Sequence, residues 1–182
     1  METDVLFANV GVPMIAVELP VMVVALIPIV LLEAVIYARL CHTTWNLAWR
    51  GSWWANVAST FIGIPVAWFV QVIVQMLIGG GSAWGIESPR DRLAAVTLQS
   101  AWLIPYEKDL DWMIPAAAIV LLVPCLLVSI FVERFVLRRY WPESIRTGLT
   151  RNVSIANMIS YLFIGAFWGV QLYFALSKRD LA

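Results

Sequence analysis

Three long stretches of the chain contain no charged residue, and each is long enough for a membrane-spanning helix. They are residues 57–78, 112–132 and 153–176. A helix needs about 20 apolar residues to cross about 30 Å of hydrocarbon, whereas the strands of a membrane barrel would alternate apolar and polar positions. The continuous apolar pattern therefore predicts helices that cross a membrane.

A fourth span is expected near residues 12–37, where the pattern is less regular. The apolar run Leu19–Leu32 reaches the required length only if Glu33, or Gly11–Val17 with Glu18, is included. The prolines of this region are expected to kink or delay the helix, which neighbouring helices tolerate; they are Pro13, Pro20 and Pro28. A cleaved signal peptide is the alternative, but the first residues, METD, are acidic where a signal peptide is basic. The pattern predicts an all-α, integral membrane four-helix bundle.

The four spans are expected to form one membrane domain, residues 1–182, built from two helical hairpins. The first hairpin covers about 12–78 and the second about 112–176, with a long loop at 79–111 between them. Within this loop, Leu93–Leu103 is expected to form a short amphipathic helix on the membrane surface.

Arginines concentrate in the two short loops, 38–56 and 133–152, which hold two and five of them. Loops rich in Lys and Arg stay on the cytoplasmic side of a membrane. We therefore expect a multi-pass protein of the bacterial inner membrane with both short loops in the cytoplasm. The two termini and the 79–111 loop are then expected outside, an N-out/C-out arrangement.

The stretch WNLAWRGSWW, residues 45–54, holds four tryptophans in ten positions. Trp45, Trp49 and Trp53 recur every four residues, which places them on one face of a helix. Tryptophan is enriched in the headgroup layer, and Arg50 can reach lipid phosphate there. The pattern predicts a membrane-interface helix made of Trp45, Trp49, Arg50, Trp53 and Trp54.

Cys41 and the single histidine, His42, lie just before this stretch and suggest a sharper alternative. A metal site needs three or four ligands, and a bis-histidine haem needs a second histidine. Pigment or haem binding through His42 alone is the weakest of the hypotheses. We expect no metal and no cofactor.

Two segments of the chain resemble each other and predict an internal repeat. Each has a proline, an apolar run and a glutamate, then a loop with basic residues and an Ala-Asn-x-x-Ser motif. The glutamates are Glu33 and Glu133, and the asparagines are Asn56 and Asn157, 23 and 24 residues further on. Both hairpins run in the same direction, so the repeat is parallel rather than inverted.

The glutamate and asparagine of each hairpin are expected at similar depth, near the cytoplasmic boundary. An Asn amide that donates to a carboxylate on the adjacent helix contributes roughly 0.5–2 kcal/mol at that depth. One interpretation is a structural clasp, with water or nearby arginines (Arg39, Arg134, Arg138) satisfying the charge. The other is a proton or cation site, because ionisable groups within spans are functional candidates.

Polar residues also form stripes on the second and fourth spans: Thr60, Gln71 and Gln75 on one, and Ser160, Tyr161 and Gln171 on the other. They are expected to be internal contacts of the bundle, and a substrate path lined by Gln71, Gln75 and Gln171 is the alternative. Gly165 and Gly169 offer a close-approach surface for self-association or for another membrane subunit.

Composition adds two limits to this picture. The chain is 62% hydrophobic, above the roughly 45–50% of soluble domains, and its formal net charge of zero gives no basic footprint for nucleic acid. No nucleophile, base and acid occur together in a recognisable pattern, so we expect no enzyme and no catalytic residues.

The motifs LLEAVIYARL, NVASTFIGIPVAW, FVERFVLRR and ANMISYLF give the chain a resemblance to the small polytopic membrane proteins of the cyanobacterial filament-integrity (septal) family. In those proteins a glutamate ends an early span and an Ala-Asn-x-x-Ser-Tyr-like motif opens the last one, although this chain is richer in tryptophan. The resemblance covers most of the chain and implies a scaffold rather than an enzyme.

The function expected first is that of a structural or accessory subunit in a larger bacterial membrane complex, with the bilayer and other membrane subunits as partners. The alternative is a small proton- or cation-coupled transporter that uses Glu33 and Glu133, one membrane carboxylate per hairpin.

Overall fold

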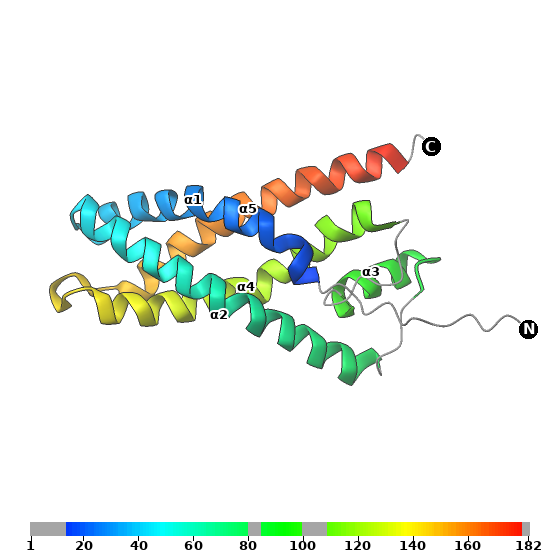
Figure 1. Cartoon of the computed structure of the whole chain (residues 1–182), viewed down its shortest axis with the longest axis horizontal. Coiled ribbons are helices and arrows are strands. Elements are labelled where there is room, and N and C mark those ends of the chain that lie inside the picture. Colours follow the sequence, from blue (N-terminus) through cyan, green and yellow to red (C-terminus); the bar gives the residue numbers. More distant parts are fainter. Residues whose placement is uncertain (1–13, 80–84, 100–108, 180–182) are drawn as a thin grey trace, which may run out of the picture.

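A computed structural model describes residues 14–79, 85–99 and 109–179, and this part of the chain is almost entirely helical. The helices are α1 (Met14–Leu40), α2 (Trp45–Gly79), α3 (Pro89–Leu98), α4 (Leu110–Tyr140) and α5 (Leu149–Arg179), with a short 3-10 turn, η2 (Glu143–Ile145), between the last two. Among the described residues, four helices are long and apolar enough to cross a membrane: α1, α2, α4 and α5. The predicted all-α four-helix membrane bundle is confirmed (Figure 1).

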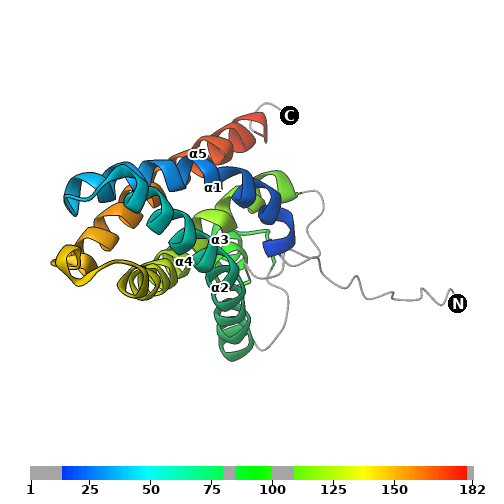
Figure 2. The ribbon, with the colours of Figure 1, turned by 60° about the vertical axis from the view of Figure 1, so that its left-hand side comes forward.

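The four long helices form a ring in which α1 and α4 lie diagonally opposite each other. Helix α2 packs against both α1 and α4, and α5 packs against the same two helices. The two short connections, α1–α2 and α4–α5, lie at one end of the bundle, while α3 and the end of α5 lie at the other (Figures 1 and 2). The ring brings residues of both hairpins to one shared interior.

The helices extend further than the uncharged runs predicted. α1 continues for seven residues beyond Glu33, and α4 for seven beyond Glu133, which is about 10 Å along each axis. The prolines Pro20 and Pro28 lie within α1 without ending it, while Pro13 lies outside the described residues. Glu33 and Glu133, which were expected near the cytoplasmic boundary, thus lie about two turns before the ends of their helices and within candidate membrane spans.

The tryptophan-rich stretch is the beginning of α2 rather than a separate helix. α2 has 35 residues and is about 52 Å long, so it exceeds the hydrocarbon thickness of about 30 Å. Trp45 and Trp54 are about half exposed. The two or three turns that carry the tryptophans thus continue the spanning helix towards the headgroup layer.

Helix α3 lies in the predicted outer loop but begins and ends earlier than expected. Ser88 caps its first turn, because the Ser88 Oγ accepts a hydrogen bond of 3.2 Å from the Asp91 amide, and Pro89 fits the first helical position. Ala95 and Val96 of α3 pack against the first turns of α4. The Ser-Pro start signal outweighs the apolar pattern that placed the helix at 93–103.

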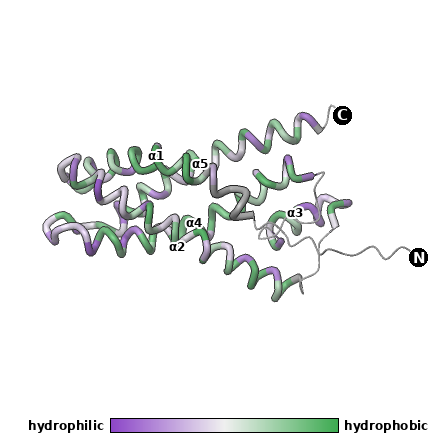
Figure 3. The backbone as a smooth tube through the Cα atoms, in the orientation of Figure 1, coloured by the Kyte–Doolittle hydropathy of each residue, from purple (hydrophilic) through white to green (hydrophobic). Residues whose placement is uncertain are grey.

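Large apolar side chains cover the outside of the bundle, and small ones fill much of the inside. Phe61, Phe131 and Leu162 are each more than 70% exposed, as expected for side chains in lipid. Ala34, Ala48, Ala55 and Ala156 are fully buried, and small residues let membrane helices approach closely. Hydrophilic positions gather at the end with the two short loops and around α3 (Figure 3).

Candidate functional site

The two glutamates singled out by the repeat are both sealed in the interior of the bundle. Glu33 on α1 and Glu133 on α4 are each 1% exposed, and they come from the two diagonally opposite helices. Both carboxyl groups accept hydrogen bonds from the same two helices, α2 and α5. The structure thus places in one site two carboxyl groups that the sequence assigned to separate hairpins.

Each carboxyl group accepts hydrogen bonds from both hairpins. Glu33 accepts from Asn56 Nδ2 at 2.6 Å and from Ser160 Oγ at 2.7 Å. Glu133 accepts from Asn157 Nδ2 at 2.7 Å and from Ser59 Oγ at 3.1 Å. We refer to these six residues, with Tyr37, as the carboxyl cluster.

The Asn-x-x-Ser spacing explains this pattern. Residues three apart on a helix are about 60° apart around its axis, so the two side chains of one motif face two neighbouring helices. On α2, Asn56 faces α1 and Ser59 faces α4; on α5, Asn157 faces α4 and Ser160 faces α1. The predicted pairing of each Asn with the Glu of its own hairpin is confirmed, and each Ser joins its hairpin to the other one.

Tyr37 breaks the symmetry of the cluster. Its hydroxyl donates to Glu133 Oε2 at 3.2 Å, whereas the equivalent position on α4 is Leu137. The Tyr37 ring also meets Trp141 edge to face, with 5.4 Å between ring centroids. Neither Tyr37 nor the partner of Ser59 was predicted from the sequence. Ser59 belongs to the repeated motif, but its partner depends on the order of the helices around the ring.

No arginine neutralises the two carboxyl groups within the described residues, since neither glutamate forms an ion pair there. Arg39, Arg134 and Arg138 are all exposed. The expected neutralisation by these arginines is therefore wrong. Arg39 and Arg138 lie more than one turn beyond the glutamates, and Arg134, although it directly follows Glu133, lies on the exposed side of α4. The cluster contains only neutral donors.

This composition has an electrostatic consequence. Burying two ionised carboxylates together without a cation has a large desolvation free energy, which hydrogen bonds from neutral donors do not offset. Asn157 Oδ1, on a fully buried residue, accepts no hydrogen bond from the described residues. A proton on one of the carboxyl groups, or a cation beside them, would remove this cost.

The remaining predicted polar residues divide between interior and surface. Gln71 and Gln75 are buried, and their Oε1 atoms have no partner among the described residues; Thr60 is half-buried. Tyr161 shares a 2.8 Å hydrogen bond with Ser129 of α4. Gln171 is exposed, so the predicted internal position of this side chain, and a path lined by all three glutamines, are wrong.

The Cys41–His42 pair does not form a ligand set with other residues. His42 is exposed in the α1–α2 turn with a positive φ of 48°. Cys41 is buried and accepts from Asn152 Nδ2 at 3.3 Å; burial raises the pKa of its thiol, and that hydrogen bond partly offsets the rise. Among the described residues no three His, Cys, Asp or Glu side chains are grouped for a metal. Pigment or haem binding through His42 stays an untested hypothesis.

The two predicted association glycines have different surroundings. A Cβ on Gly165 would lie 3.3 Å from Leu122 Cδ1 of α4, so this glycine already serves contact within the chain. A Cβ on Gly169 would meet nothing within 4 Å.

Comparison of the chain with protein-family models, curated proteins and solved structures finds no match. The resemblance to the septal family therefore stays a prediction.

Proposed function

We propose that this protein is a small proton- or cation-coupled transporter in which Glu33 and Glu133 together hold the coupling charge. The observation that carries the proposal is a pair of carboxyl groups, each 1% exposed, with hydrogen bonds from neutral donors alone. Ionisable groups inside a membrane domain are costly and commonly mark ion pathways.

The position of the pair between two repeated hairpins supports this function. Coupling-ion sites of many transporters lie at the interface of internal repeats, which move against each other during transport. Here the bonds from Ser59 and Ser160 cross that interface. Loss of the shared proton or cation leaves two negative charges buried in one interior, and their repulsion favours separation of the hairpins. Binding or release of the proton or cation would then change how closely the two hairpins pack.

The arginine-rich short loops support an inner-membrane location with those loops in the cytoplasm. The carboxyl cluster lies about 10 Å along the helix axis from that end of the bundle. In this orientation the pair exchanges its charge with the cytoplasm over a short path and with the outside over a longer one.

Reconstituted liposomes loaded with the pH dye pyranine test the proposal. Vesicles containing the protein are expected to change internal pH faster than protein-free vesicles when a pH, Na⁺ or K⁺ gradient is imposed. The E33Q/E133Q variant keeps the shape of both side chains but removes their ability to carry the charge, and its rate is expected to fall to that of protein-free vesicles. Glu87→Gln removes an exposed carboxylate and is expected to leave the rate unchanged.

Size-exclusion chromatography establishes that the variants are folded before the flux comparison. Wild-type vesicles that match protein-free vesicles under all three gradients would contradict the proposal. An equal rate for E33Q/E133Q and wild type would contradict the role of the two glutamates.

An accessory role in a larger complex is a second candidate, favoured by the outer half of α5. There Phe167, Val170, Tyr173 and Phe174 are all about half exposed or more, and open space surrounds Gly169. This part of α5 diverges from α2 in both views (Figures 1 and 2). It is thereby free to pack against another membrane helix.

Purification from native membranes in mild detergent tests this candidate. Stoichiometric co-elution of another membrane subunit is expected, and Gly169→Leu is expected to abolish it by filling the open space. Gly85→Leu, where an added Cβ also meets nothing within 4 Å, serves as the matched control. Recovery of a lone chain, or equal recovery with both variants, would count against an accessory role through α5.

A further inference from the structure

An open pocket of about 600 Å³ lies where α4 turns into α5, at the end of the bundle with the short loops. It is separate from the carboxyl cluster. Its walls are the last turns of α4, the η2 region and the first turn of α5: Arg134, Arg138, Glu143, Arg146, Gly148, Leu149, Thr150 and Arg151.

The pocket is strongly basic. Four of its lining residues are arginines and one is a glutamate, which leaves a formal local charge of +3. Arg134 and Arg138 lie one turn apart on α4, and Arg151 faces them from α5; all three are exposed. None of these three forms a hydrogen bond or ion pair with another described residue. Their guanidinium groups are therefore available to an anion.

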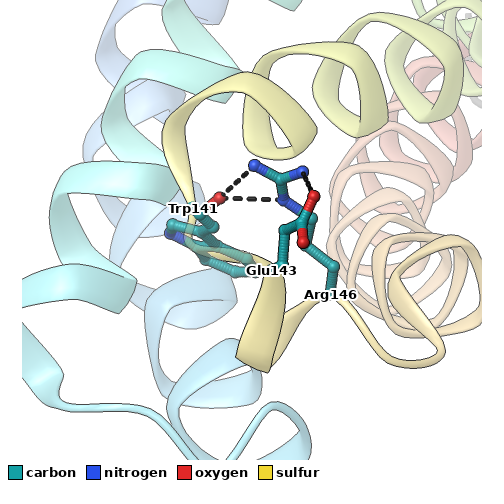
Figure 4. Close-up of polar contacts among 3 residues, drawn as sticks. All are labelled: Trp141, Glu143 and Arg146. Carbon is teal, nitrogen blue, oxygen red and sulfur yellow. Dashed lines mark hydrogen bonds and ion pairs between the residues drawn. The ribbon is translucent and has the colours of Figure 1, made fainter.

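Arg146 is held in place by the chain around it. Its Nε and Nη2 donate to the Trp141 carbonyl oxygen at 2.8 and 2.6 Å, and its Nη1 lies 3.8 Å from Glu143 Oε1 (Figure 4). Trp141 is 1% exposed, and its Nε1 donates to the Leu47 carbonyl oxygen at 3.3 Å. One wall of the pocket is thus fixed to the buried core, which reduces the ordering cost of binding.

The arrangement matches the chemistry of a phosphate group. Guanidinium groups bind phosphate with two parallel hydrogen bonds. Helix α5 begins at Leu149, so its first turn adds the positive end of the helix dipole to the same pocket; the Leu149 amide itself donates to the Arg146 carbonyl oxygen at 3.0 Å. Three free arginines and a helix start surround a space large enough for a headgroup.

The apolar surface next to the pocket favours a lipid as the source of that phosphate. Phe131 and Leu127 lie about one and two turns before Arg134 on the same exposed face of α4, and they are 76% and 62% exposed. An acyl chain can lie along these side chains while its headgroup reaches the arginines. We infer that this pocket binds the phosphate of an anionic phospholipid, with Arg134, Arg138 and Arg151 as its ligands.

Native mass spectrometry of the purified full chain in detergent tests the inference. The probes are dioleoylphosphatidylglycerol, dioleoylphosphatidylcholine with the same acyl chains, and inorganic phosphate. One equivalent of phosphatidylglycerol is expected to bind in preference to phosphatidylcholine. Each arginine removed is expected to weaken this binding roughly fivefold, so R134Q/R138Q should be about 25-fold weaker.

R90Q/K178Q is the matched control, because it removes the same charge from exposed positions at the other end of the bundle. Its binding is expected to equal that of wild type, and circular dichroism checks that both double variants remain helical. Equal binding of the two lipids, or equal losses in the two double variants, would overturn the inference. Inorganic phosphate that binds without lipid and displaces phosphatidylglycerol at millimolar concentration would overturn the lipid as the source and leave a soluble phosphate compound.

Discussion

Glu133→Ala is expected to destabilise the folded bundle by about 3–5 kcal/mol. The substitution removes the acceptor shared by Asn157, Ser59 and Tyr37 and leaves a cavity in the interior. Ser59 and Asn157 can still donate to backbone carbonyls, whereas the Tyr37 hydroxyl keeps no other acceptor among the described residues. Each buried donor left unpaired costs about 1–3 kcal/mol. Because native proteins are stable by only about 5–15 kcal/mol, a fall in thermal midpoint in detergent will report the loss clearly.

Three companion variants separate this effect from general damage. Glu143→Ala removes a carboxylate whose side chain is 93% exposed and is expected to change stability by less than about 0.5 kcal/mol. Glu33→Ala removes an acceptor of two donors rather than three, and both donors have backbone carbonyls to bond instead, so it should cost less than Glu133→Ala. The difference between the two glutamates should shrink in a Tyr37→Phe background, since Tyr37 is the additional donor. A Glu133→Ala protein as stable as wild type would show that the cluster does not hold the hairpins together.

Gly51→Ala is expected to destabilise the bundle by about 2 kcal/mol, despite the usual preference for alanine over glycine in a helix. A Cβ at this position would lie 2.5 Å from Trp141 Nε1 and 2.8 Å from Trp141 Cε2. The indole cannot move aside freely, because it is 1% exposed and packs against Tyr37. The overpacking is thus expected to exceed the gain in helix propensity.

Gly169→Ala is the matched control, because it also replaces a helical glycine but meets nothing within 4 Å. It is expected to stabilise the protein by about 0.5–1 kcal/mol. Thermal unfolding of both variants in one detergent gives the comparison. Stabilisation by Gly51→Ala equal to that by Gly169→Ala would mean that Trp141 does not pack on α2 as described.

The contacts of the carboxyl cluster that lie within one hairpin could be predicted from the sequence. Glu33 and Asn56, like Glu133 and Asn157, lie on consecutive helices joined by a short loop, so their spacing alone sets their relative depth. The cross-hairpin bonds of Ser59 and Ser160 depend on which helices are neighbours in the ring. Apolar periodicity is nearly uniform around a helix in lipid and does not encode that order.

The depth of Glu133 and its expected neutralisation by arginine were both predicted wrongly because the end of α4 was placed too early. An uncharged run ends at the first charge, whereas a helix continues until its backbone meets a turn, as α4 does beyond Glu133. Because Glu133 was expected near the cytoplasmic boundary, water and arginine side chains were expected beside it. The continuation of α4 by seven residues buries Glu133 and carries Arg138 into the basic pocket.

The exchange of serines between hairpins has a consequence for biogenesis. As the ribosome inserts this chain into the membrane, α1 and α2 enter first, and Glu33 then has Asn56 but not Ser160. Glu133 receives Ser59 early, but Asn157 arrives only with the final helix. Neither hairpin can form all of its polar contacts alone. The first hairpin therefore lacks the hydrogen bond from Ser160 to Glu33 until α5 has been synthesised. A chain truncated after α2 would keep that defect permanently, and membrane quality-control proteases could recognise it by this feature.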